Sequence, residues 1–183
     1  TYNKSNRKRD NKVMNHAKIN DLEEIMDVFK QYGDTFPHIR KDKIERMIKS
    51  GNVVWEEGVL ITYNRYKRKQ KLGLVEQSMF GKGPYVKLPY EAQEGDCILH
   101  QIAAKNQGDG SGKRIFERFV EYNTGRDIVL SVRSDNDRAI QFYKNNGFIK
   151  VSNIEWGKTK QVKGEIYLLE QKSLYRFKEN SFV

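Results

Sequence analysis

Hydrophobic residues in the first half of the chain recur at helical spacing in some segments and at strand spacing in others. The predicted helices are 20–33 and 41–50. The predicted strands are 13–19, 53–55 and 59–63. Asn20-Asp21 is a typical helix cap, Gly51 is a typical helix stop, and Glu57-Gly58 between the last two strands indicates a hairpin.

The second half alternates more regularly between strands and helices. The predicted strands are 98–103, 128–132, 148–156 and 165–169, and the predicted helices are 113–122 and 137–146. Residues 64–95 contain Gly81, Gly83, Pro84 and Pro89, and we expect an insertion or a mobile loop there. This element order predicts a mixed α/β sheet rather than a regular βαβ alternation.

Length and charge fit one domain with a basic tail. The chain has 183 residues, with 34 Lys and Arg against 24 Asp and Glu, for a net charge of +10. Basic residues crowd the segment 1–12, which we expect to be a mobile tail before a single domain at 13–183, and they also crowd 65–71. Both clusters would attract nucleic acid or an acidic protein, although a solvated tail and loop explain them equally well.

The apolar runs, the cysteine and the histidines bear on membrane association, cellular compartment and metal binding. No apolar run is long enough for a membrane span or, at the start of this sequence, for a signal peptide, so we expect no membrane association. Cys97 is the single cysteine, which favours a reducing, cytoplasmic compartment. The histidines His16, His38 and His100 lack metal-ligand spacing, and we expect no metal.

A glycine-rich turn lies between the predicted strand 98–103 and the helix that follows it. Glycines allow the chain to turn tightly and to direct several N–H groups toward one point, and a helix N-terminus adds further donors, so the turn suits phosphate. Its spacing fits neither the P-loop nor the dinucleotide fingerprint. A glycine-rich turn without a ligand is the structural alternative. The turn reads Gln107-Gly108-Asp109-Gly110-Ser111-Gly112-Lys113.

Two segments resemble signatures of the GNAT-superfamily N-acetyltransferases. Gln107-x-x-Gly110-x-Gly112 is similar to the Arg/Gln-x-x-Gly-x-Gly/Ala turn of that family, and 136–148 is similar to its Asn-x-x-Ala-x-x-hydrophobic-Tyr element followed by Gly-Phe. The resemblance is close over 96–148 and loose elsewhere. It implies an α/β (α+β) fold with one domain, whose central, mixed and splayed sheet has about six to seven strands and about four flanking helices.

The resemblance also implies an acetyl-CoA-dependent N-acetyltransferase and assigns its site residues. Tyr143 falls where many members place the general acid, and Asn136 falls where the family contacts the cofactor. The strand position whose backbone meets the pantetheine arm is Ile102, followed by Ala103 and Ala104. The residues whose backbone amides would bind the pyrophosphate are Gln107, Gly108, Asp109, Gly110, Ser111, Gly112 and Lys113.

The acceptor amine must lose a proton, and the sequence leaves the base open. Strict strand alternation would place Asp96, Ile98, His100 and Ile102 on one face and Cys97 on the other. That placement disfavours an acetyl-cysteine route and favours direct transfer. The candidate bases are Asp96, His100, the weaker Glu94, or a water chain. Asp96 as a strand end and His100 as a core histidine are the structural alternatives.

The acceptor is open as well. It would meet aromatic residues interleaved with cations, which suit nucleic acid or an acidic protein but also a plain hairpin with a basic edge. These residues are Trp55, Tyr63, Tyr66, Phe80, Tyr85 and Tyr90, with Arg65, Lys67, Arg68 and Lys69. The rival functions are a non-catalytic module of the same fold that binds CoA or nucleic acid, and an acyltransferase with another donor. Either a monomer or a homodimer is compatible with the sequence.

Overall fold

The chain folds around one mixed six-stranded sheet. A computed structural model describes residues 13–36, 39–67, 74–76, 85–87, 93–156 and 162–172. The strand order is β1-β2-β5-β6-β8-β7, in which β5 and β6 are parallel and the other neighbours are antiparallel. The strands are β1 Val53–Glu56, β2 Val59–Arg65, β5 Cys97–Ala104, β6 Ile128–Arg133, β7 Ile149–Trp156 and β8 Val162–Leu169. The predicted mixed sheet is therefore confirmed.

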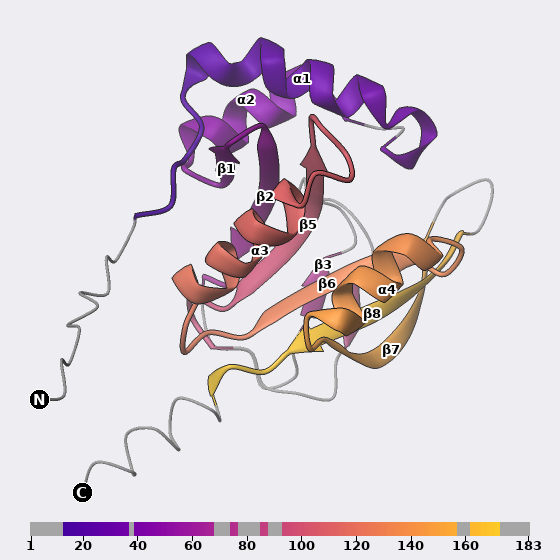
Figure 1. Cartoon of the computed structure of the whole chain (residues 1–183). Helices are drawn as coiled ribbons and strands as arrows, with labels where there is room; N and C mark the ends of the chain where they lie inside the picture. Colours follow the sequence, from indigo (N-terminus) through magenta and orange to yellow (C-terminus); the bar gives the residue numbers. More distant parts are fainter. Residues whose placement is uncertain are drawn as a thin grey trace, which may run out of the picture.

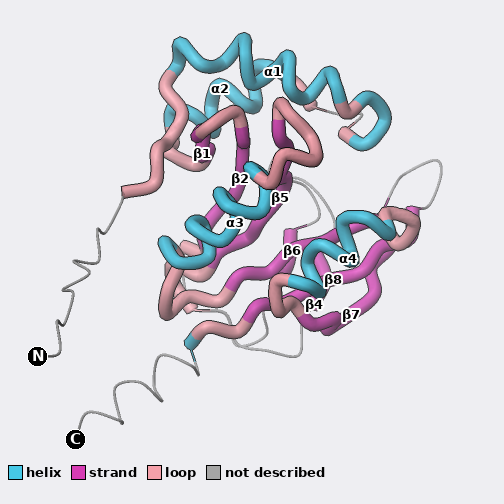
Figure 2. Tube along the Cα trace, viewed as in Figure 1, coloured by secondary structure: helices cyan, strands magenta, loops and turns pink. Residues whose placement is uncertain are grey.

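Four helices in the described part of the chain cover both faces of this sheet. They are α1 Leu22–Gln31, α2 Lys41–Lys49, α3 Ser111–Tyr122 and α4 Asp137–Asn145. Helices α1 and α2 pack on one face, and α3 and α4 pack on the other (Figures 1 and 2). A separate two-stranded hairpin, β3 Leu74–Glu76 with β4 Tyr85–Lys87, lies against β6.

Helical and strand periodicity explain the two main core clusters. Ile25, Val28 and Phe29 of α1 share one face of the helix and pack with Ile44 of α2 on the sheet. On the opposite face, α3 contributes apolar residues at the spacing expected of an amphipathic helix. These residues are Ile115, Phe116 and Phe119. Removing such side chains from water is the main source of stability for the sheet and helices.

One predicted strand differs from the structure. Residues 13–19 do not form a full strand: His16 makes an isolated bridge to Val54, and the chain then turns into a short 3-10 helix at Ile19–Asp21. The turn is closed by the Asp21 carboxylate, which accepts the Lys18 N–H at 2.7 Å.

The expected boundaries of the tail and insertion stay a prediction. Within 64–95 the described residues include the end of β2 and the β3–β4 hairpin, and the rest of that segment and the tail at 1–12 lie outside the described residues. None of the helices in the described ranges has the length and apolar character that a bilayer crossing requires.

Candidate active site

The parallel strands β5 and β6 separate partway along their length. Pairing runs from Cys97 to Leu99 on β5, and the register shows no further pair between the two strands within the described residues. Strand β5 nevertheless continues to Ala104, and β6 continues to Arg133. We call the parts of β5 and β6 that do not pair with each other, residues 100–104 and 131–133, the splayed segment. The splayed sheet implied by the resemblance is therefore confirmed.

Backbone hydrogen bonds show which amides of β5 face the splayed segment. The Gln101 N–H donates to Thr62 Oγ1 at 3.1 Å, and the Lys105 N–H donates to Gly58 O at 2.8 Å, so both point toward β2. Because successive amides of a strand alternate in direction, the N–H groups of Ile102 and Ala104 face away from β2, toward the side of β6.

The three strand residues predicted to bind the cofactor, Ile102, Ala103 and Ala104, therefore differ in the direction and the partners of their backbone amides. The Ile102 amide fits the predicted contact with a ligand in the splayed segment. The Ala104 N–H instead donates to the Tyr32 hydroxyl at 2.8 Å. The backbone of Ala103 faces β2, and its side chain packs in the cluster of α1 and α2.

A bulge at His100 overturns the predicted strand alternation. Thr62 pairs with Gln101 and Tyr63 pairs with Leu99, so His100 is an extra residue on β5. As a result, Ile98 packs on the face opposite α3 and α4, whereas Ile102 packs on the α3 and α4 face. The prediction that Ile98 and Ile102 share a face was wrong, because the extra residue reverses the parity.

The same bulge corrects the expectation for Cys97. Its side chain lies on the α3 and α4 face, together with Ile102, rather than on the opposite face. The thiol is fully buried, and burial raises its pKa to about 12. Because a thiolate is the nucleophile, burial rather than direction disfavours an acetyl-cysteine route.

The glycine-rich turn has the backbone and the open space that a diphosphate needs. Gly108 and Gly110 have φ values of +83° and +80°, which side-chain-bearing residues rarely adopt. Among the described residues, and leaving aside each glycine's chain neighbours and the backbone of α3 at Gly112, no heavy atom lies within 4 Å of the position that a Cβ would take at Gly108, Gly110 or Gly112. The first helical bond of α3 runs from the Arg114 N–H to Gly110 O at 3.1 Å, so the Gly112 and Lys113 amides have no partner in that helix. The turn therefore fits the predicted group.

Two features of this turn were not apparent in the sequence. The Asp109 carboxylate accepts the Ser111 N–H at 2.8 Å, which places a negative charge at the start of α3. Hydrogen bonds from Ser111 lower the pKa of Asp109, so this carboxylate is ionised near neutrality. The second feature is that Arg114, which follows the turn in α3, is paired: its guanidinium contacts the Glu57 carboxylate, with Nε at 3.2 Å.

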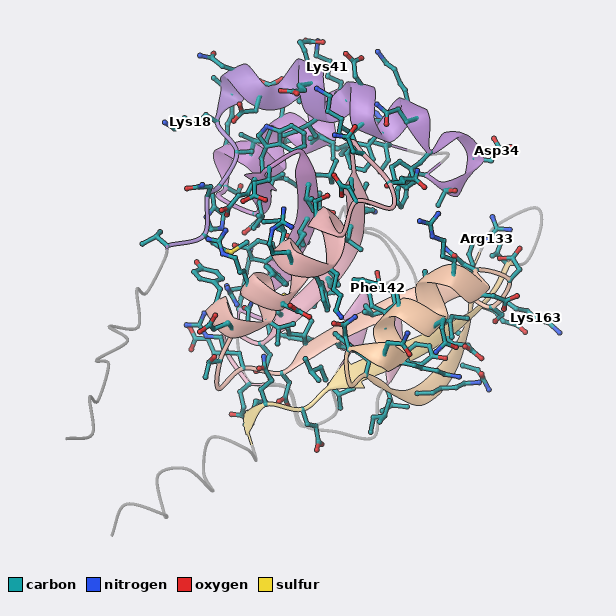
Figure 3. All side chains as sticks on the ribbon, in the orientation of Figure 1. Lys18, Asp34, Lys41, Arg133, Phe142 and Lys163 are labelled. Carbon is teal, nitrogen blue, oxygen red and sulfur yellow. The ribbon has the colours of Figure 1, made fainter. Side chains whose placement is uncertain are left out.

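The two predicted residues of α4 lie in different environments. Asn136 caps the helix, with its side-chain oxygen accepting the Ala139 N–H at 3.1 Å. Tyr143 is 6% exposed and packs against Phe116 of α3 and against Phe148. Burial raises the pKa of the Tyr143 phenol, so it stays protonated at neutral pH. Its neighbour Phe142 fills the space between α3 and α4 (Figure 3).

His100 is held in one protonation state by two asparagines. The Asn52 amide donates to Asn64 Oδ1 at 3.2 Å, which orients the Asn64 amide to donate to His100 Nε2 at 3.0 Å. Nε2 is therefore an acceptor, and the proton of the neutral ring is on Nδ1. Burial lowers the pKa of His100 to about 4, in agreement with a neutral imidazole.

Asp96 directly precedes β5, at the end of the strand away from the glycine turn, and its carboxylate is engaged by other groups of the fold. Its side chain is 1% exposed and accepts the N–H groups of Gln93 at 2.8 Å and Asp127 at 3.1 Å. It also contacts the Lys172 ammonium, which in turn lies 3.2 Å from the Asp127 carboxylate. Asp96 and His100 are four residues apart on a strand, or roughly 13 Å, so they do not share a site. Glu94 is exposed in the turn before β5.

The predicted aromatic acceptor surface is not formed as expected. Tyr63 and Tyr66 are buried, and Trp55 packs against the cluster of α1 and α2. Arg65 lies over the Tyr63 ring at 5.2 Å and donates to Gly95 O at 2.9 Å, so it is part of the protein interior. The side chains of Phe80, Tyr85, Tyr90, Arg68 and Lys69 lie outside the described residues, as does His38.

The structure brings together the turn, the Ile102 amide and the start of α4, and it separates the candidate bases from one another. The contacts of Tyr32, Asn52 and Asn64 were not predicted from the sequence. No local pattern marks these residues, because each contact joins elements far apart in the chain. Arg138 was also missed, although it lies inside the second signature segment; its Nη1 donates to Gln107 Oε1 at 2.9 Å.

Comparison with known proteins identifies the fold. No protein-family model matches the sequence, and no curated protein matches it. Solved structures that share its fold across most of the chain are GNAT acetyltransferases. Arabidopsis thaliana Naa50, in complex with the bisubstrate analogue CoA-Ac-MVNAL, has a TM-score of 0.58 and 13% identity, covering 86% of this chain and 97% of its own.

Bacterial structures are similar to the same extent. Streptococcus mutans smu.2055 has a TM-score of 0.59 and 18% identity, covering 87% of this chain and 99% of its own. The ribosomal-protein-S18-alanine N-acetyltransferase of Escherichia coli has a TM-score of 0.54 and 16% identity, covering 87% and 93%. At these identities the likeness establishes the fold, a GNAT-like domain with a mixed, open sheet and four described helices.

Proposed function

We propose that the protein is an acetyl-CoA-dependent N-acetyltransferase that transfers the acetyl group directly to an amine acceptor in a ternary complex. The observation that carries this proposal is the position of the open glycine turn at the end of the splayed strand β5. Amides suited to phosphate thereby lie next to the part of β5 that does not pair with β6, so one extended ligand can contact both. Acetyl-CoA would supply the acetyl group as a thioester, and the acceptor nitrogen would take it.

The chain's own groups have separate roles in this proposal. The amides of Gly112 and Lys113 bind phosphate, and the Ile102 N–H fixes the ligand along β5. Tyr143 holds a proton at its hydroxyl, which its raised pKa keeps in place at neutral pH. The buried Cys97 thiol takes no part, which supports direct transfer.

The environments of the candidate bases favour an acceptor that is already partly neutral. Asp96 is engaged by an ammonium and two amides, and the lone pair of His100 Nε2 is engaged by Asn64. At pH 7.5 a lysine amine with pKa about 10.4 is roughly 0.1% neutral, whereas an α-amine with pKa about 7.8 is roughly one-third neutral. We therefore propose a peptide α-amine as the acceptor class. Two structural neighbours agree with this choice: Arabidopsis thaliana Naa50 binds the bisubstrate analogue CoA-Ac-MVNAL, and the Escherichia coli protein is a ribosomal-protein-S18-alanine N-acetyltransferase.

Calorimetry with acetyl-CoA tests the cofactor part of the proposal. Gly112→Glu places bulk and negative charge where the phosphate would lie, and the open space at Gly112 allows the fold to accept it. We expect binding by the parent and a loss of about 100-fold or more in the variant, equivalent to about 2.7 kcal/mol. Gln141→Glu, which adds the same charge on an exposed position of α4, is the matched control and should bind normally. A parent protein that does not bind acetyl-CoA would contradict the proposal.

Thiol release tests the chemical step. A peptide with a free α-amine should be acetylated faster than the same peptide with a blocked N-terminus and one lysine. Tyr143→Phe should lower kcat by about 100-fold or more while leaving acetyl-CoA affinity unchanged, because it removes the hydroxyl group and keeps the ring that packs against Phe116 and Phe148. Binding without release against any amine would instead support the non-catalytic module.

A further inference from the structure

Cationic side chains around the glycine turn are mostly neutralised by carboxylates. The loop before α3, the helix itself and the end of β6 each contribute one or more of them, and each contacts an acidic residue. The pairs are Lys105 with Glu24 at 2.9 Å, Lys113 with Glu117 at 3.8 Å, Arg114 with Glu57, Arg118 with Glu56, and Arg133 with Asp135 at 2.7 Å. Such pairs reduce the attraction of each cation for an incoming anion.

Arg138 differs from these cations. It is exposed in the first turn of α4, and among the described residues its guanidinium contacts the neutral Gln107 side chain rather than a carboxylate. A guanidinium that exchanges an amide oxygen for phosphate oxygens gains a charge-assisted and bidentate contact, and it breaks no ion pair to do so.

The contact between Arg138 and Gln107 joins the two sides of the splayed segment. Gln107 follows β5, and Arg138 follows β6, at the ends where these strands no longer pair. The hydrogen bond of 2.9 Å therefore brings the guanidinium next to the turn at Gly108 and Gly110, whose Cβ positions are open. Figure 3 shows Arg133 at the same end of the molecule, where β6 leads into α4.

We infer that Arg138 binds the diphosphate of the ligand held at the glycine turn, and that it leaves Gln107 to do so. This inference rests on the proposed function, which supplies the ligand. In this inference the cation that assists the backbone amides comes from α4, across the splayed segment from the turn. It does not come from Lys113 or Arg114, which follow the turn in the sequence.

Calorimetry with CoA on matched variants tests the assignment. Arg138→Gln should weaken CoA binding about tenfold, since hydrogen bonds to charged groups are among the stronger ones. Arg133→Gln lowers the net charge by the same amount at the same end of the protein, and we expect a change of less than about twofold because its guanidinium is paired. Arg138→Lys should recover part of the affinity, because it keeps the charge without the planar fork.

Gln107→Ala separates phosphate binding from a structural bridge. If Arg138 contacts the ligand, removal of its resting partner should cost much less affinity than removal of Arg138. Equal losses in the two variants would overturn the inference, and so would equal affinities of Arg138→Gln and Arg133→Gln. Both sites are exposed, so unchanged thermal unfolding is expected in each case and is measured alongside.

A second ligand fixes which phosphate is bound. The tenfold loss in Arg138→Gln should persist with 3′-dephospho-CoA if the contact is to the diphosphate, and its disappearance would overturn the assignment. Failure of the parent protein to bind CoA would instead contradict the proposed function, so the two failures are distinguishable.

Discussion

The two ends of the β5–β6 pair carry charged residues of the same types in opposite physical settings. At the amino end, Asp96 and Asp127 are buried and share the Lys172 ammonium. At the carboxyl end, the splayed segment is bounded by exposed groups, and Arg138 contacts only a neutral amide among the described residues. The comparison shows that strand pairing, rather than residue type, separates charges that hold the fold from charges that a ligand can reach.

We call the amino end of β5 and β6, where the two strands pair, the paired end, and the carboxyl end, where they separate, the open end. The largest effect should come from the paired end. Asp96→Ala would remove one of the carboxylates that contact Lys172 and would remove the acceptor of the Gln93 and Asp127 N–H groups. We therefore expect the free energy of unfolding to fall by about 3–5 kcal/mol. Urea denaturation measures this loss. Acetyl-CoA affinity, measured where the variant is still folded, should match the parent, because Asp96 is remote from the turn.

Asp135→Ala is the matched control at the other end. It removes a carboxylate of the exposed Arg133 pair, and we expect little change in stability. If Asp96→Ala were as stable as the parent yet inactive, the paired end would be part of the catalytic machinery and the comparison would fail.

His100 lies at the boundary between the two ends and should make stability depend on pH. Its pKa is about 4 in the folded protein and about 6.5 when unfolded, so the unfolded chain binds the extra proton between these values. The contribution of the neutral His100 to the free energy of unfolding is therefore fully present at pH 7. It is lost as the pH is lowered from 6.5 to 4, by on the order of 3 kcal/mol. His100→Gln should flatten this part of the profile, as measured by denaturation at pH 7 and pH 4.5.

A second histidine provides the comparison for that profile. His16→Gln removes a partly buried ring whose nitrogens contact Met14 O and the Tyr63 hydroxyl, outside the Asn52–Asn64 network, and should leave the acid-dependent loss in place. An unchanged profile in His100→Gln would show that its ring is hydrated and free rather than held neutral by Asn64.

The sequence predicted the open end better than the paired end, for a physical reason. The glycine turn is a local feature, since it is built from neighbours in the chain. Asp96 and Lys172 are 76 positions apart, so their contact depends on how β8 returns to the sheet. The bulge at His100 was missed for the same reason, because it is a property of the register between β2 and β5.

The smallest effect separates the open end from a generic basic surface. Asp109→Asn should strengthen acetyl-CoA binding by about threefold, because it removes a carboxylate next to the site proposed for the phosphates while its amide oxygen can still accept the Ser111 N–H. Asp135→Asn removes the same charge from a carboxylate paired with Arg133 and is the control. If only the net charge governed binding, both variants would gain equally, since each makes the protein more positive by one. A gain confined to Asp109→Asn would locate the phosphates at the turn itself, and a loss in that variant would mean that the carboxylate positions the turn rather than competing with the ligand.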